Sequence, residues 1–176
     1  MTRTHRSVSQ SSPAAVALSL SMRAPTAKEH IPFLRRQLQA AHAFLRPPLR
    51  ELSLALVGRR RMMALHARYL HVASATDVLS FELDHDRHGR VIAGEVIVCT
   101  SVARAQAEHR DHSERIEMLL YALHGMLHLC GYNDVSRRGS AEMHSMEDQI
   151  LCRLGLGRAF DSAAKPARAD GADRWA

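Results

Sequence analysis

Cysteine is scarce in this chain of 176 residues, which contains only Cys99, Cys130 and Cys152. Three is an odd number, and no two of these cysteines have the spacing of paired metal ligands. We therefore expect buried thiols in a reducing compartment rather than a disulfide framework. Long hydrophobic runs are also missing, because no stretch of the sequence is long enough to cross a membrane. These two absences predict a cytoplasmic protein without a membrane partner.

Lysine is nearly absent too, because Lys28 and Lys165 are the only two lysines although the net charge is +6. Arginine therefore carries almost all of the positive charge, and its planar guanidinium suits bidentate contacts with phosphate groups. A basic chain is a candidate for a nucleic-acid partner, but an arginine-rich composition alone would give the same net charge. The triplet Arg59–Arg61 has two interpretations: a solvated helix start, which is the more common one, and a phosphate-contacting patch.

The residues that are present suffice for a single domain, since 46% of them are hydrophobic. Residues 1–13 are rich in Ser, Thr and Arg and lack acids, a composition that loosely resembles a transit peptide. We expect a disordered N-terminal extension instead, because chain termini are commonly unordered. Residues 158–176 are small, charged and aperiodic, so we expect a disordered tail. The expected domain therefore spans residues 14–157.

The spacing of apolar residues predicts the secondary structure. Alternation of apolar and polar residues predicts strands at about 16–22, 52–56, 76–81 and 91–99. Apolar residues that recur at threes and fours predict helices at about 27–45, 59–69, 101–109, 113–130 and 140–154. Ser113 and Ser140 are the expected N-caps of the last two helices. This order predicts an α/β (α+β) fold, in which a small mixed four-stranded sheet packs with about five helices.

The helix predicted at 113–130 carries potential metal ligands near its end. His124 and His128 are four residues apart and therefore lie on one face of a helix. Gly131 would end that helix in a left-handed turn, after which Asp134 could fold back over the two imidazoles. Two His and one Asp give three ligands, so a tetrahedral ion would keep a fourth position open, as in catalytic zinc sites. The alternative is a pair of hydrogen-bonded core histidines, but imidazoles buried in such an apolar segment need partners.

The spacing of these ligands also invites comparison with the zinc metallopeptidases. In those enzymes a Glu follows the first His and acts as the general base. Gly125 stands at that position here, so a peptidase of this class would lack its base. A zinc metallopeptidase is kept as an alternative function.

The segment HGMLHLCGYND, from His124 to Asp134, closely resembles the HGxLHLxGYDH signature of the YbeY endoribonucleases, also called rRNA maturation factors. Residues 76–81, TDVLSF, are similar to a strand of that family, and residues 94–97, GEVI, resemble its GDIvI strand. The resemblance covers roughly residues 14–157. It implies a metal-dependent, single-strand-specific endoribonuclease that matures the 3′ end of small-subunit ribosomal RNA and takes part in ribosome quality control. The implied partners are ribosomal RNA and the ribosome, including small-subunit proteins.

The resemblance also implies which residues hold the metal, because the family's three signature histidines bind one ion, usually taken to be zinc. His124 and His128 match the first two positions, and Asp134 replaces the third histidine. An aspartate oxygen is a competent zinc ligand, so we expect one Zn²⁺ per chain in a His2Asp site, with harder ions gaining relative to zinc. Asn133 replaces the aspartate that precedes the third ligand, which is expected to weaken the support of the site.

One departure from the family concerns an arginine that is tied to RNA cleavage. The family often has it directly after the tyrosine that precedes TDVLSF, but here Leu70 follows Tyr69. The phosphate-facing cation would then be Arg68 or the triplet at Arg59–Arg61. This departure keeps a third function open, a non-catalytic ribosome-binding assembly factor. The general base is also undecided, and its candidates, each with a solvated surface position as the other interpretation, are Glu142, His144 and Glu147.

Overall fold

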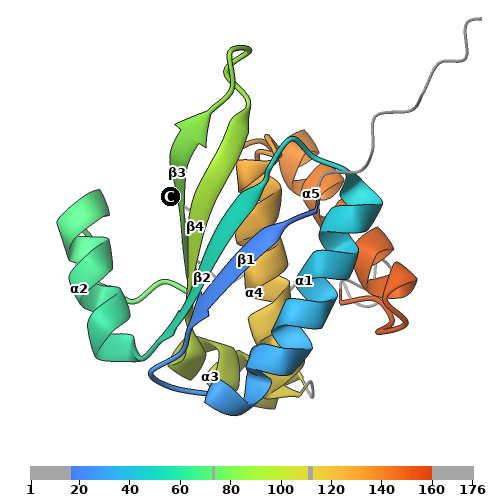
Figure 1. The fold of residues 1–176 in the computed structure, drawn as a ribbon. Helices are drawn as coiled ribbons and strands as arrows, with labels where there is room; N and C mark the ends of the chain where they lie inside the picture. The colour runs from blue at the N-terminus through green and yellow to red at the C-terminus, as the bar shows by residue number, and fades with distance from the viewer. Residues whose placement is uncertain (1–16, 73, 111–112, 160–176) are drawn as a thin grey trace, which may run out of the picture.

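A four-stranded mixed sheet lies at the centre of the computed structural model, which describes residues 17–72, 74–110 and 113–159 (Figure 1). Its strands are β1 (Ser19–Arg23), β2 (Glu51–Val57), β3 (Val78–His85) and β4 (Val91–Cys99), in the spatial order β1-β2-β4-β3. Strands β1, β2 and β4 run parallel, and β3 pairs with β4 in the antiparallel direction. Strand β3 therefore forms one edge of the sheet.

Five α-helices and one short 3-10 helix pack on the two faces of this sheet. They are η1 (Lys28–His30), α1 (Ile31–Leu45), α2 (Arg59–Leu70), α3 (Thr100–Arg110), α4 (Glu114–Leu129) and α5 (Arg137–Arg153). Helices α1, α4 and α5 lie on one side of the sheet, and α2 lies on the other (Figure 1). Helix α2 reaches the sheet through a small apolar cluster that includes Met62, Leu65 and Ile97.

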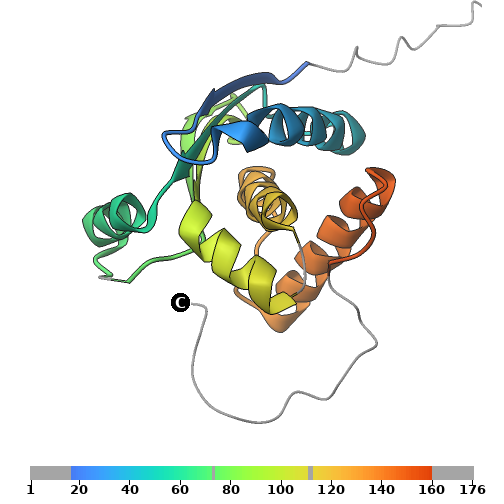
Figure 2. The ribbon, with the colours of Figure 1, turned by 90° about the horizontal axis from the view of Figure 1, so that it is seen from below.

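Helix α4 is at the centre of the molecule because it is apolar on almost every side. A helix that is hydrophobic all round is stable only when other elements enclose it. Figure 2 shows α4 nearly end-on, surrounded by the sheet, α1, α3 and α5. The half-buried His124 and His128 interrupt its apolar surface near the C-terminal end. The predicted ligands therefore lie where α4 leaves the core.

The structure confirms the predicted fold class and corrects details of it. Helix α5 begins at Arg137 instead of following a cap at Ser140. Its N-cap is Ser136, whose hydroxyl accepts a hydrogen bond from the backbone N–H of Gly139 at 3.0 Å. The predicted disordered extension 1–13 lies outside the described residues, as does the predicted tail apart from Arg158 and Ala159.

The three cysteines are free thiols, but they are not all buried as expected. Cys99 is buried, Cys130 is half-buried, and Cys152 is exposed on α5. Burial raises the pKa of the Cys130 thiol to about 12, so this cysteine is protonated at neutral pH and is a poor nucleophile. Within the described ranges, no helix has the length and apolar character needed to cross a membrane.

Candidate metal centre

The structure brings the three predicted ligands His124, His128 and Asp134 together. The Nε2 atoms of the two histidines are 3.1 Å apart. Each of these nitrogens lies 3.6 Å from a carboxylate oxygen of Asp134. Ligands on a tetrahedral zinc ion, about 2.0–2.1 Å from the metal, are about 3.3 Å from one another. The observed separations bracket this value, so the three side chains fit a divalent ion of zinc's size.

The second nitrogen of each imidazole determines the tautomer. His128 Nδ1 lies 3.1 Å from the carbonyl oxygen of Tyr132, which can only accept a hydrogen bond. His124 Nδ1 lies 2.9 Å from Oε1 of Glu147, which is an acceptor when ionised. Both Nδ1 atoms therefore carry a proton, and in the neutral rings both Nε2 atoms present lone pairs. Two lone pairs and a carboxylate that converge in this way favour a cation between them.

Glu147, one of the three candidate general bases, supports the ring of His124 in the structure. Its side chain is only 1% exposed, and no described residue hydrogen-bonds to its Oε2 atom. The solvated alternative for Glu147 is therefore wrong. The sequence did carry a signal, because Glu147 falls on the same helical face as the buried Met143 and Ile150. An acid in register with an apolar stripe indicates a carboxylate that is buried against a partner.

The electrostatics of the two histidines differ. Burial alone would lower the pKa of His124, but the hydrogen bond and negative charge of Glu147, with the charge of Asp134, raise the pKa above its usual value. Burial lowers the pKa of His128, and the neighbouring His124 lowers it further. In the metal-free protein, a proton is therefore held more tightly by His124 than by His128.

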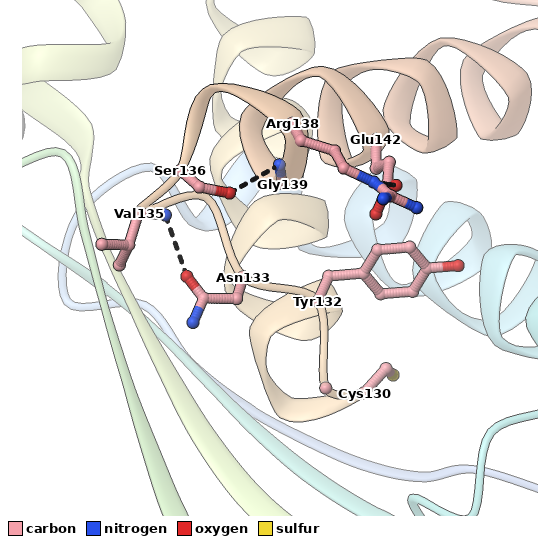
Figure 3. A pocket seen from close by; sticks show the side chains of 9 residues that line it. Cys130, Tyr132, Asn133, Val135, Ser136, Arg138, Gly139 and Glu142 are labelled. Carbon is pink, nitrogen blue, oxygen red and sulfur yellow. Dashed lines mark hydrogen bonds and ion pairs between the residues drawn. The ribbon is translucent and has the colours of Figure 1, made fainter.

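The turn between α4 and α5 brings Asp134 to the two histidines. Figure 3 shows the residues on either side of Asp134 in this turn, Asn133 and Val135. Gly131 has a φ of +92°, which a side chain would disfavour, and it reverses the chain after α4. Asn133 Oδ1 then accepts a hydrogen bond from the N–H of Val135 at 2.9 Å, which closes a local turn around Asp134. Asn133 thus supports the site through the backbone, although it replaces the aspartate of the family signature.

The turn is also held against the start of α5. A Cβ on Gly139 would lie 2.0 Å from the carbonyl oxygen of Asn133, so only glycine allows the helix to approach this closely. The outer side of the turn lines a separate surface pocket of about 650 Å³, shown in Figure 3. The exposed candidate base Glu142 belongs to that pocket, where it pairs with Arg138 at 2.8 Å.

Two of the predicted ligands, His124 and Asp134, line a pocket of about 270 Å³. His144 lines it and keeps its place as a candidate base. Other lining residues were not singled out in the sequence: Asp77, Arg110 and Tyr121. Asp77 belongs to the TDVLSF segment, which could have pointed to it, whereas nothing in the sequence near Arg110 or Tyr121 indicates a pocket.

The arginines expected from the sequence lie elsewhere. Arg68 is on α2, across the sheet from α4, with its guanidinium over the ring of Tyr69 at 5.6 Å. Arg61 lines a groove beside that tyrosine, between α2 and the sheet. Neither residue lines the pocket of the predicted metal ligands. The catalytic role of Arg68 stays a prediction, and the structure does not bring Arg68 together with His124, His128 and Asp134.

The fold and the cluster together define an α+β protein with a potential three-ligand metal centre at the end of its central helix. Comparison with known proteins then identifies the family. The family model described as Endoribonuclease YbeY matches residues 19–155. The chain belongs to this family, which confirms the resemblance read from the three motifs and makes the protein an enzyme that acts on RNA.

Individual relatives agree with this assignment. An Endoribonuclease YbeY of Acidothermus cellulolyticus is 36% identical over 132 residues, which cover 69% of this chain and 79% of the relative. One from Thermobifida fusca is 40% identical over 111 residues, which cover 59% of this chain and 72% of the relative. The solution structure of TM1509 from Thermotoga maritima aligns with a TM-score of 0.55 at 18% identity, covering 84% of this chain and all of that one. This last likeness supports the fold alone.

Proposed function

We propose that this protein is a metal-dependent endoribonuclease that cuts single-stranded RNA. It would act in the cytoplasm on the 3′ end of small-subunit ribosomal RNA and in ribosome quality control, in contact with the ribosome and its small-subunit proteins. Family membership supports the reaction class, and the convergence of His124, His128 and Asp134 supports the dependence on a metal. We further propose one Zn²⁺ per chain, because two imidazole nitrogens and a carboxylate oxygen are a donor set that zinc accepts.

The residues of the chain would divide the work as follows. A divalent ion, when bound, supplies Lewis-acid chemistry to a phosphodiester oxygen. The Nε2 atoms of His124 and His128 and the Asp134 carboxylate would hold it. Glu147 and the Tyr132 carbonyl hold the two rings so that Nε2 stays available. His144, on the wall of the same pocket, is the proposed acceptor of a proton from the attacking group.

The metallopeptidase alternative meets a steric obstacle at Gly125. A Cβ at this position would lie 2.8 Å from Cγ1 of Val96 and 3.2 Å from Cγ2 of Val78, so it would point into the sheet. A glutamate at this position would clash with β3 and β4 and would be directed away from the ligand atoms. Close packing of α4 on the sheet therefore excludes the general base that zinc metallopeptidases carry here.

The test combines cleavage in vitro with complementation. The wild type, His124→Ala and Asp134→Ala are compared on single-stranded RNA and in a strain that lacks its own YbeY, with ribosomal RNA 3′ ends mapped. His88→Ala, in the exposed β3–β4 turn, is the matched control. Both ligand variants should lose cleavage and correct 3′ ends, while the control keeps them. Correct ends in both ligand variants would instead favour the non-catalytic assembly factor, and elemental analysis of the purified wild type identifies the ion.

A further inference from the structure

The pocket of the predicted metal ligands has an unbalanced set of charges. Three carboxylates line it, from Asp77, Asp134 and Glu147. The one permanent cation among its described lining residues is Arg110, at the C-terminal end of α3. An RNA phosphate that enters this pocket meets three acids, and a bound divalent ion would offset only part of their charge. A cation from the protein is therefore needed where the phosphate lies.

Arg110 is held in place by a buried acid. Its Nη1 atom lies 3.7 Å from Oε1 of Glu117, on α4, whose side chain has no exposed surface. Tyr121 also lines the pocket, and burial together with the negative charges of Asp77 and Glu117 raises the pKa of its hydroxyl, so it stays neutral beside this carboxylate. A buried carboxylate is strongly destabilising without its counter-charge, so Glu117 fixes the position of the guanidinium. The Arg110 side chain is nevertheless 39% exposed, which leaves N–H donors available to a ligand.

Other arginines lack this combination of placement and support. Arg68 stacks over Tyr69 on the far face of the sheet. Arg104, two turns earlier on α3, pairs with Glu114 at 3.3 Å and has a side chain that is 67% exposed. Neither belongs to the lining of the metal pocket. Arg104 is thus a matched control, an arginine on the same helix that also pairs with an acid of α4.

We propose that Arg110 binds a phosphate of the RNA substrate in the metal pocket, with Glu117 as its positioning residue. This inference rests on the proposed function, because it takes RNA as the ligand of the pocket. A guanidinium offers two parallel N–H donors to phosphate oxygens, and charge-assisted bonds of this kind are stronger than neutral ones. Leu70 stands where the family often has an arginine. Arg110, at the C-terminal end of α3, would substitute for that arginine, rather than an arginine on α2.

The experiment measures RNA binding separately from cleavage. Metal-free protein is titrated with a fluorescein-labelled single-stranded RNA oligonucleotide over a range of salt concentrations, and anisotropy gives the affinity. Arg110→Gln should weaken binding roughly 10-fold or more, since it removes a charged hydrogen bond. The slope of log affinity against log salt should fall by about 0.7, the contribution of one phosphate contact on a single strand. Arg104→Gln should change neither quantity.

A second variant guards against misfolding, because Arg110→Gln removes a positive charge from beside the buried Glu117. The double variant Arg110→Gln/Glu117→Gln removes both charges and should show the same loss of RNA affinity with a wild-type circular dichroism spectrum. Zinc stoichiometry should be unchanged in both variants. A wild-type salt slope in the folded double variant would overturn the proposal, and so would a loss of slope confined to Arg68→Ala. If the wild type binds RNA through Arg110 but does not cleave it, the proposed function fails and this inference stands.

Discussion

His124 and His128 differ in how tightly they hold a proton, although both present Nε2 to the same point. The carboxylates of Glu147 and Asp134 attract a proton to His124, whereas the half-buried His128 has a carbonyl oxygen, and not an acid, beside its Nδ1 atom. Metal binding requires both Nε2 atoms to be unprotonated. The proton on His124 is therefore the main competitor of the ion.

The first prediction concerns the pH dependence of metal affinity. The raised pKa of His124 means that its proton binds at a higher pH than on a free histidine, so zinc affinity should begin to fall on acidification near that raised pKa. Below the lowered pKa of His128, a second proton competes and the fall should steepen. Competition with a chromogenic chelator, corrected for the chelator's own protonation, measures the affinity from mildly alkaline to mildly acidic pH. An affinity that stays constant over this range would show that neither histidine is a ligand.

The second prediction isolates the contact between Glu147 and His124. Glu147→Ala removes the acceptor that fixes the His124 ring, so zinc affinity should fall roughly 10- to 100-fold, as for other partners of metal-bound histidines. Glu142→Ala is the control, since Glu142 is exposed on the same helix and pairs with Arg138. The chelator competition distinguishes the two variants without reference to activity. Equal affinities for both would mean that Glu147 only fills space in the core.

Helix α4 is positioned by two close approaches to strand β4, each made by a glycine. Gly125 on the helix meets Val96, and Gly94 on the strand meets Leu129, whose Cδ1 atom would lie 2.5 Å from an added Cβ. Reciprocal contacts of this kind bring the backbones together and set the height of α4 above the sheet. His124 and His128 are carried by the same helix, so this packing also sets the position of the site.

The third prediction follows from the packing of Gly125. In an exposed helix, Gly→Ala would stabilise the protein by about 1 kcal/mol through helix propensity. Here the Cβ would overlap Val96, so Gly125→Ala should instead lower the free energy of unfolding by about 1–3 kcal/mol. Urea denaturation measures the change. The double variant Gly125→Ala/Val96→Ala frees the space and should lose less stability than the sum of the two single variants, whereas additive losses would locate the strain elsewhere.

Elements could be predicted from the sequence more fully than contacts between them. The strands and helices follow from apolar periodicity, and the placement of His124 and His128 on one helix face follows from helical spacing, because both depend on residues close in the chain. The predicted N-cap of α5, Ser140, lies after the observed one, Ser136, because the first turn of the helix is polar and shows no apolar periodicity. The presence of Arg110 in the pocket depends on how the end of α3 packs against α4, and no local pattern encodes that packing. The sequence shows that Gly125 stands where metallopeptidases have their base. The steric reason for a glycine there becomes visible only when the facing strand is in place.

At the scale of the whole molecule, the candidate metal centre joins the central helix to the turn that leads into α5. His124 and His128 come from α4, Asp134 from the turn, and the supporting Glu147 from α5. These segments are also packed into one core, through Met143 and Ile150 of α5 among others. An ion bound only by the folded arrangement must therefore stabilise the whole domain by mass action.

The last prediction is that zinc raises the melting temperature. At a free zinc concentration of 100 times the dissociation constant, linkage adds about 2.7 kcal/mol to the free energy of unfolding. For a chain of this size, that gain corresponds to a rise of roughly 5–10 °C, which differential scanning calorimetry resolves and a chelator should reverse.

The chain has 12 histidines, so binding outside the centre has to be separated from binding within it. Asp134→Ala removes one proposed ligand and leaves all 12 histidines in place, so most of the rise should disappear in this variant. A full rise that persists in Asp134→Ala and in His124→Ala would place the stabilising ion at another site and would remove the support for a His2Asp centre.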